Sequence, residues 1–290
     1  MFSKIKILFT GLVILSYYTP FFKIQNLIAI VMFLTVGVLH GACDITLINH
    51  KKNNEDLGKK IIFIVLYLLT AFFAFLFVYN FPIIGFVAFL LISSYHFGEQ
   101  HLHHLVLKTK LKFFHYLVYG LLIFMMMIYT NKIFVFDVLN QILGNDIKSL
   151  PFDIFLFTTL FFTFFLWWID NKNLKFSVIK EILNLSLLFL LFYSSNLIVS
   201  FSVYFVLWHS IPSILDQINF LYSEISVKSI FLYMKNSGSY WIISIVGLIF
   251  LFYYQDMIGE DFYMLLYSFS ASVTIPHIFL INNILSVDHN

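Results

Sequence analysis

The stretch IIFIVLYLLTAFFAFLFVY, residues 61–79, contains no charged residue, no proline and no glycine. A helix of about 20 apolar residues is long enough to cross the roughly 30 Å hydrocarbon core of a bilayer. The run shows neither the two-residue alternation of a half-buried strand nor a heptad pattern. It therefore predicts a transmembrane helix.

The composition of the whole chain extends this interpretation. Of the 290 residues, 61% are hydrophobic and only 11% are charged, which is typical of an integral membrane protein. The formal net charge is only +2 and no basic patch is interleaved with aromatic residues, so nucleic-acid binding is not expected. The single cysteine, Cys43, cannot form an internal disulfide.

Charged or turn-forming breaks divide the chain into about ten apolar runs, and no linker is long enough to separate domains. We therefore expect one all-α integral membrane domain over residues 1–290, a polytopic bundle of about ten transmembrane helices. The predicted spans lie near residues 5–22, 25–47, 61–79, 82–103, 112–130, 152–169, 181–197, 200–220, 240–254 and 262–284.

The lysines provide a test of this topology, because cytoplasmic loops of membrane proteins are enriched in basic residues. With ten spans and the N-terminus inside, 14 lysines fall on the inner side and only Lys23, Lys132 and Lys148 fall outside. This asymmetry predicts that both termini are cytoplasmic. The expected location is the inner (cytoplasmic) membrane of the cell, with several passes.

The ten histidines fall into two groups by predicted depth. Six lie near span ends or in loops, where an imidazole stays hydrated, and these we expect at the surface: His50, His101, His103, His104, His115 and His289. The other four lie inside apolar runs: His40, His96, His209 and His277. An ionisable group inside a bilayer is costly and normally faces the bundle interior or a polar cavity.

The four deep histidines share a direction and a similar depth. They lie on four different predicted spans that all run from outside to inside, and three of them lie one to two turns from the inner end; His209 is nearer mid-span. This agreement predicts one shared site in the inner half of the membrane. Imidazole ligands suit zinc, copper, iron or nickel, so the residue type alone does not name the metal.

Carboxylates lie close to two of these histidines. Asp44 follows His40 by four residues and Glu99 follows His96 by three, spacings that share one helical face. Because a metal-bound histidine commonly donates its other ring N–H to a carboxylate, both acids are candidate partners of the ligands. Spacing leaves open whether Asp44 reaches His40 or a neighbouring ligand.

Helix-modifying residues accompany the same motifs. We expect Gly37 and Gly41 to allow a neighbouring helix to approach His40 closely. Pro276, directly before His277, is expected to kink its helix beside a cavity.

Four ordered motifs resemble a known family. HGACD at 40–44, YHFGE at 95–99, LWHS at 207–210 and PH at 276–277 are similar to the Brp/Blh-type bacterial and archaeal β-carotene 15,15′-dioxygenases. The resemblance implies an iron-dependent membrane enzyme that splits β-carotene with O₂ into two retinal molecules, commonly for a microbial rhodopsin. It also implies Fe(II) ligation by the histidines of these motifs, His40, His96, His209 and His277, and accessory polar roles for Asp44 and Glu99.

The chain departs from the family pattern at one position. Many members carry a second histidine one turn after the WHS motif, whereas this chain has Ser213 there. We expect the four histidines to complete the site, with Ser213 as a small residue that bonds a backbone carbonyl near Pro212.

Three other classes of protein compete with this interpretation. A membrane di-iron hydroxylase needs several clusters such as HxxxH, and only HLHH at 101–104 comes near, with the wrong spacing. A haem electron carrier usually places two histidines on each of two helices, whereas these four lie on separate spans. A transporter or carotenoid-binding protein would bind without reacting, and O₂ consumption with β-carotene distinguishes it.

Overall fold

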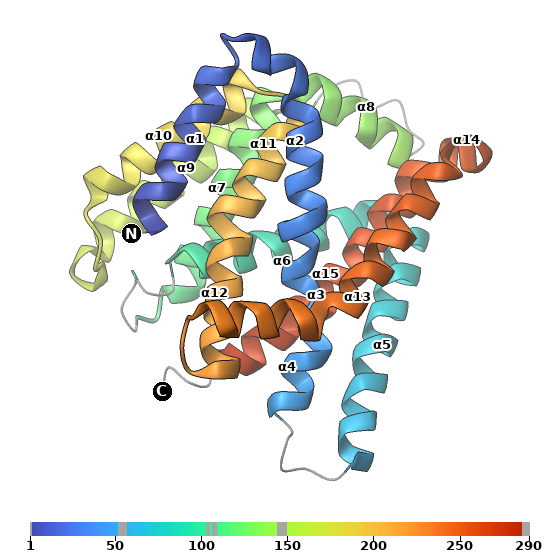
Figure 1. The fold of residues 1–290 in the computed structure, drawn as a ribbon. Helices are drawn as coiled ribbons and strands as arrows, with labels where there is room; N and C mark the ends of the chain where they lie inside the picture. Colours follow the sequence, from blue (N-terminus) through green and yellow to red (C-terminus); the bar gives the residue numbers. More distant parts are fainter. Residues whose placement is uncertain (1, 52–56, 103–104, 106–108, 144–149, 286–290) are drawn as a thin grey trace. The chain divides into compact units, whose positions relative to one another are not determined.

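The computed structural model describes residues 2–51, 57–102, 105, 109–143 and 150–285. These residues are predominantly helical and form no β-strand (Figure 1). Eight helical segments among them are long and apolar enough to cross a membrane: Gln25–Lys51, Leu57–Asn80, Pro82–Leu102, Lys112–Thr130, Phe152–Ile169, Leu197–Tyr222, Val227–Tyr253 and Phe262–Asn283. The prediction of an all-α, multi-pass membrane fold is confirmed.

The helix boundaries depart from the ten predicted spans at three places. The predicted spans 5–22 and 181–197 correspond to α1 (Phe2–Ser16) and α10 (Val178–Ser194), which have 15 and 17 residues. Both are shorter than the eight segments above. The predicted break at 235–239 is wrong, because α13 runs without interruption from Val227 to Tyr253.

The start of α13 explains that error. The hydroxyl of Ser226 accepts from the backbone N–H of Ser229, and the hydroxyl of Ser229 accepts from the backbone N–H of Ser226. This reciprocal capping box starts the helix well before the predicted position. Gly238 lies in the helix interior, where a glycine costs only about 1 kcal/mol relative to alanine.

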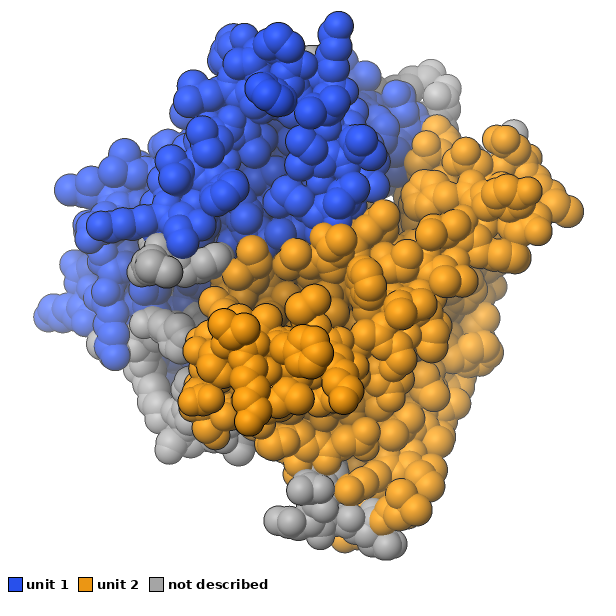
Figure 2. All heavy atoms as spheres, viewed as in Figure 1, with its two compact units in different colours: residues 1–33, 90–140, 145–209 blue, residues 34–89, 141–144, 210–290 orange. Residues whose placement is uncertain are grey.

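The chain divides into two compact units, coloured separately in Figure 2. Unit 1 comprises residues 1–33, 90–140 and 145–209, and unit 2 comprises residues 34–89, 141–144 and 210–290. Each unit therefore draws on three separate stretches, and no single cut in the sequence divides them. The expectation of one domain over residues 1–290 stays a prediction.

Unit 1 is built around α7, which packs against α9, α10 and α11, while α1 packs on α10 and α2 on α11. Its elements, some shared with unit 2, are α1, the 3₁₀ turn η1 (Pro20–Ile24), α2 (Gln25–Met32), the second part of α6 (Pro82–Leu102), α7 (Lys112–Thr130), α8 (Lys132–Leu143), α9 (Phe152–Ile169), the 3₁₀ turn η3 (Asn171–Asn173), α10, α11 (Leu197–Tyr204) and most of the π-helical turn η4 (Phe205–Ser210).

Two glycines bring α6 and α7 unusually close together. A Cβ added at Gly98 would lie 1.8 Å from the carbonyl oxygen of Tyr116, and one added at Gly120 would lie 1.8 Å from that of Ser94. No side chain fits at either position, so glycine is required by the close approach of the backbones. Because His96 lies between Ser94 and Gly98, this crossing fixes the segment that carries it.

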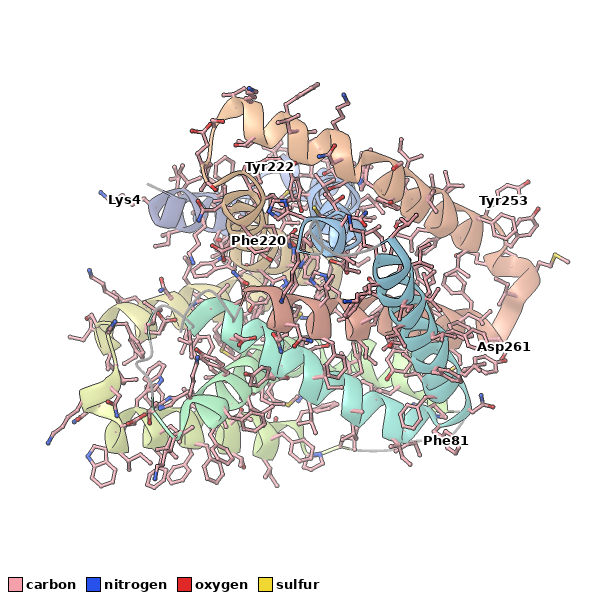
Figure 3. The ribbon with its side chains drawn as sticks, turned by 90° about the horizontal axis from the view of Figure 1, so that it is seen from below. Lys4, Phe81, Phe220, Tyr222, Tyr253 and Asp261 are labelled. Atoms are coloured by element: carbon pink, nitrogen blue, oxygen red, sulfur yellow. The ribbon has the colours of Figure 1, made fainter. Side chains whose placement is uncertain are left out.

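Unit 2 packs α5 along α15, and α13 and α12 against α3. Its elements are most of the π-helical turn η2 (Phe33–Gly37), α3 (Val38–Ala42), α4 (Asp44–Lys51), α5 (Leu57–Asn80), the first part of α6, α12 (Ile211–Tyr222), α13, α14 (Gln255–Ile258), the 3₁₀ turn η5 (Gly259–Asp261) and α15 (Phe262–Leu285). Tyr253 and Asp261 lie at the two ends of the turn between α13 and α15 (Figure 3).

The core of unit 2 surrounds the segment that carries the HGACD motif. Cys43 and Leu47, which are both fully buried, pack with Ile218 from α12, Tyr233 from α13 and Ile281 from α15. Three helices, α12, α13 and α15, thus meet around the short stretch from Cys43 to Leu47. The indole of Trp241 on α13 also donates to the carbonyl of Leu34 in η2 at 2.8 Å, which satisfies a backbone group of the π-helical turn.

Candidate metal centre

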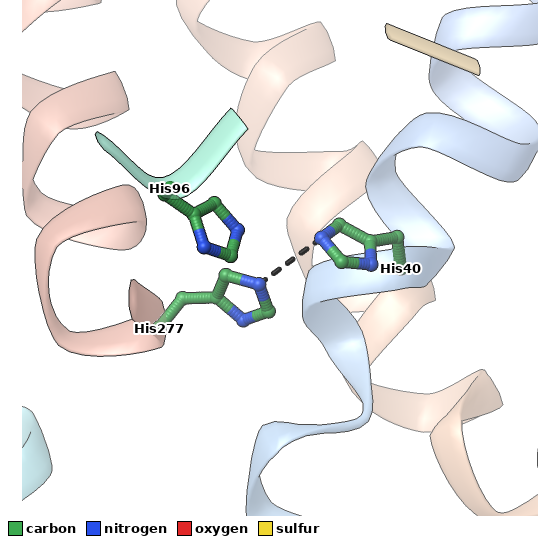
Figure 4. A group of neighbouring side chains, drawn as sticks. All are labelled: His40, His96 and His277. Atoms are coloured by element: carbon green, nitrogen blue, oxygen red, sulfur yellow. Dashed lines mark hydrogen bonds between the residues drawn. The ribbon is translucent and has the colours of Figure 1, made fainter. Parts of the chain in front are cut away.

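The four deep histidines are buried, and they form one pair within each unit. In unit 2, Nε2 of His40 on α3 faces Nε2 of His277 on α15 at 3.0 Å. The two ring centroids lie 4.6 Å apart and the rings are nearly perpendicular, at 78° (Figure 4). His96, drawn in the same figure, belongs to unit 1 and is described with that unit.

The His40–His277 pair suits a divalent metal in its geometry. When two imidazole nitrogens each lie about 2.1 Å from one metal and the two metal–nitrogen bonds form a right angle, the nitrogens lie about 3.0 Å apart. The Nε2 atoms of His40 and His277 have this separation. Neutral imidazoles are also ligands that iron accepts, so the donor set fits the metal that the motifs imply.

Asp44 binds the far side of the His277 ring. Its Oδ1 lies 2.8 Å from Nδ1 of His277, and its Oδ2 accepts from the hydroxyl of Tyr67 on α5 at 2.7 Å. Because a carboxylate only accepts, Nδ1 of His277 carries the proton and Nε2 presents its lone pair toward His40. This carboxylate–histidine arrangement is the one that commonly orients metal ligands.

The alternative left open by the sequence is thereby resolved: Asp44 reaches a neighbouring histidine and not His40. The reason is local, because α3 ends at Ala42 and α4 begins at Asp44, with Cys43 between them. The even helical spacing that would place Asp44 over His40 is interrupted there. Tyr67 was not predicted, although a hydroxyl inside a charge-free span is a signal that could have indicated it.

A side-chain amide occupies the other side of the His40 ring. Nε2 of Gln217 on α12 lies 3.3 Å from Nδ1 of His40, and the hydroxyl of Tyr233 on α13 donates to Oε1 of Gln217 at 2.7 Å. The hydroxyl oxygen of Ser213 accepts from the same amide nitrogen at 3.3 Å. Ser213 therefore contacts a side chain and not the backbone carbonyl that we expected. No pattern in the sequence indicated Gln217.

A Cβ added at Gly41 would meet nothing within 4 Å, so this glycine is not required for a close helix approach and that expectation is wrong. Pro276 lies inside α15, and the kink beside a cavity that we expected there stays a prediction. Without an N–H it cannot donate to the preceding turn.

In unit 1, His96 on α6 and His209 in η4 form the second pair. Their ring centroids lie 4.9 Å apart and the rings are inclined at 75°. The ring of His209 also packs edge-on against Phe97, with centroids 4.3 Å apart, and stacks on Phe205 at 5.3 Å. His209 thus has an apolar, aromatic environment on the sides that these rings cover.

One π-helical turn lies just before a histidine motif and the other contains one. η2 ends three residues before His40, and η4 contains His209. A π-helical turn places an extra residue in the helix, which changes the direction of the side chains that follow, and such turns are frequent at functional sites. The sequence interpretation, based on regular helices, missed both.

Glu99 lies in unit 1 on the same helix as His96. Its Oε1 accepts from the hydroxyl of Tyr95 at 3.5 Å, a long contact across one helical turn. The accessory role expected for Glu99 stays a prediction.

The surface location predicted for six histidines is wrong for two of them. The side chain of His101 is only 5% exposed, and its Nε2 lies 2.9 Å from a carboxylate oxygen of Glu181 on α10. Tyr119 donates to the same carboxylate oxygen, and the ring of His101 stacks on Trp208, the residue before His209. His50 is exposed, as expected, while His103, His104 and His289 lie outside the described residues.

His115 is the second buried exception. Its Nε2 lies 2.9 Å from Asp170, which directly follows α9, and Asn173 also donates to this carboxylate. Burial raises the pKa of Asp170, but the hydrogen bonds from Asn173 and His115 outweigh burial and lower it. The His115–Asp170 pair links the start of α7 to the end of α9, so we assign it a structural role.

Comparison with known proteins adds the identity of the family. The family model described as β-carotene 15,15′-dioxygenase matches residues 31–285, which is most of the chain and includes all four histidine motifs. No curated protein and no solved structure matches the chain. The match covers the buried histidine pairs of both units, and the chain belongs to the β-carotene 15,15′-dioxygenase family.

Proposed function

We propose that this protein is an iron-dependent membrane dioxygenase that cleaves the central double bond of β-carotene to give retinal. The family match supports the reaction class, and the helices that can cross a membrane support a reaction within the bilayer. The observation that carries the proposal is the buried His40–His277 pair, whose facing nitrogens are braced from behind by Asp44.

In the proposed reaction, one carbon–carbon double bond breaks and two carbon–oxygen double bonds form. Each oxygen atom of O₂ ends in one aldehyde, so β-carotene and O₂ give two retinal molecules without another reductant. Fe(II), when bound, would supply the redox chemistry that allows O₂ to react with an alkene. The protein must hold the central bond of an apolar polyene beside the metal, which is a task of positioning.

The residues of the site have separate tasks in this proposal. His40, His96, His209 and His277 would hold Fe(II), which would supply the chemistry that activates O₂. Asp44 keeps a proton on Nδ1 of His277, so that Nε2 remains available as a ligand. The shared predicted depth of the four histidines supports one common centre. Glu99 would act as an accessory polar group.

The cellular setting belongs to the same proposal. Both termini would face the cytoplasm, as the lysine asymmetry favours, and the protein would reside in the inner membrane. Retinal is an apolar aldehyde that would remain in the bilayer, where a microbial rhodopsin would be its acceptor.

Expression in a β-carotene-producing bacterium tests the proposal. We expect loss of the orange colour and two retinal molecules per β-carotene consumed, measured by chromatography of extracted pigments. His277→Ala, expressed at the same level, should leave the colour unchanged, while the exposed His50→Ala should behave as wild type. A well-expressed wild-type protein that leaves β-carotene intact would instead indicate a carotenoid-binding protein or transporter.

A further inference from the structure

The amide of Gln217 is buried and has a polar partner on each side. Its exposed fraction is 0%, and so is that of Ser213, its partner one turn earlier on α12. The amide nitrogen lies 3.3 Å from Nδ1 of His40 and 3.4 Å from the backbone carbonyl of the same residue. The amide oxygen accepts from Tyr233, which is 1% exposed. A buried glutamine needs such partners, because an unpaired amide costs about 1–3 kcal/mol.

The partners of this amide allow two arrangements of hydrogen bonds. In the arrangement described, the Gln217 amide nitrogen donates to Nδ1 of His40. Nδ1 then accepts and carries no proton, so the ring proton of His40 lies on Nε2. Turning the amide by 180° brings Oε1 to His40 and the amide nitrogen to the Tyr233 oxygen. The hydroxyls of Tyr233 and Ser213 can each donate or accept, so both remain paired after the turn. The turn gives up only the long 3.4 Å contact with the backbone carbonyl of His40, which can only accept.

The turned arrangement is the one that suits a metal ligand. A histidine that binds metal through Nε2 carries its proton on Nδ1, and this proton needs an acceptor. Nε2 of His40 is the atom that faces His277, so Nδ1 is the atom left for a partner. Gln217 is placed to accept there through Oε1, as Asp44 accepts from Nδ1 of His277.

We propose that Gln217 is the positioning residue of His40, that it accepts the Nδ1 proton when His40 binds metal, and that Tyr233 holds its amide in place. This inference rests on the proposed function, because it takes His40 as a metal ligand. It pairs each histidine of unit 2 with its own buried acceptor: a carboxylate for His277 and an amide for His40. Asp44 lies in the HGACD motif, whereas Gln217 lies outside all four histidine motifs.

Substitutions at Gln217 separate this role from a purely structural one. Gln217→Glu keeps an acceptor opposite Nδ1 of His40 but cannot donate to the His40 carbonyl or to Ser213. Gln217→Leu removes both abilities. If Gln217 serves as an acceptor, glutamate should replace it; if it serves only as a donor that stabilises the fold, glutamate should fail as leucine does.

The experiment is a Co(II) titration of the purified full-length protein in detergent, followed by the visible absorption of the metal. Gln217→Leu should weaken Co(II) binding by about 10-fold to 100-fold, the range found when a partner of a ligand is lost. Gln217→Glu should bind as tightly as wild type or more tightly. Tyr233→Phe, which keeps the ring, should give a smaller loss. Asn219→Leu is the matched control, since Asn219 is an exposed amide on the same helix and should bind as wild type.

The outcomes are distinguishable. Wild-type protein that binds Co(II), with Gln217→Leu unchanged or Gln217→Glu as weak as Gln217→Leu, would overturn the role of Gln217 and leave the proposed function intact. Wild-type protein that binds no Co(II) would overturn both. An absorption spectrum that shifts in Tyr233→Phe as well as in Gln217→Leu would support the inference, because a change confined to folding would not alter the ligand field.

Discussion

Replacing Asp44 by asparagine removes a charge from the site while keeping its shape. Asp44 is 2% exposed and has two close partners, Nδ1 of His277 at 2.8 Å and the hydroxyl of Tyr67 at 2.7 Å. An asparagine can still accept from His277 through its oxygen and donate to Tyr67 through its nitrogen. The loss is therefore that of charge assistance, about 1–2 kcal/mol, from the difference between charged and neutral hydrogen bonds.

This energy corresponds to Fe(II) binding that is about 5-fold to 30-fold weaker. Asp44→Ala should cost more, because it removes the acceptor of both the buried Nδ1–H of His277 and the half-buried hydroxyl of Tyr67, at about 1–3 kcal/mol for a buried donor. Anaerobic Fe(II) titration of the two variants measures both effects. Asp153→Asn, on an exposed position of α9, is the control and should bind iron as wild type. Equal losses in Asp44→Asn and Asp44→Ala would show that the two hydrogen bonds an asparagine retains contribute nothing to iron binding.

Three further predictions concern packing, the site and topology. Gly120→Ala should destabilise the protein by about 1–3 kcal/mol or more, because its Cβ would lie 1.8 Å from a facing carbonyl oxygen. Gly238→Ala should not destabilise it in this way, because a Cβ there meets nothing within 4 Å. Thermal unfolding in detergent compares the two variants. Ser213→Ala should leave iron content nearly unchanged, and a clear gain of iron in Ser213→His would show that a ligand is missing. Reporter fusions after Asn53 and Asn145, both outside the described residues, should report opposite sides of the membrane.

The helical fold could be predicted because long apolar runs have few alternatives in a bilayer. The helix ends were less predictable. The start of α13 depends on a capping box between two serines in a polar stretch, and serines are too common for such a pair to stand out. Gly98 and Gly120 were equally inconspicuous, because only the contact between α6 and α7 distinguishes them from Gly41, where a side chain would fit.

The deep histidines were predictable because an imidazole inside an apolar run is unusual. Their partners were harder, since each comes from a distant stretch of chain. Asp44 was found by spacing, but its contact with His277 depends on the interruption of the helix at Cys43. Gln217 has no spacing relation to His40, from which it is 177 residues away. Only the packing of α12 against α3 brings the two together.

The burial of His101 could not be predicted from its position in the sequence. It lies at the end of α6, where a hydrated ring was expected, yet it is buried against Glu181 and Trp208. The acid comes from α10, and its burial depends on α10 packing on α7. A predicted depth along one helix does not tell whether a neighbouring helix covers its end.

We propose that His40, His96, His209 and His277 hold one iron. Iron stoichiometry of the purified protein, combined with X-ray absorption at the iron edge, tests this in wild type and in the four single alanine variants. We predict one iron per chain with four imidazole ligands, and loss of bound iron in every variant. Two irons per chain would show that the four histidines do not form one centre. The same conclusion would follow if the His96→Ala and His209→Ala variants retained full iron on the His40–His277 pair.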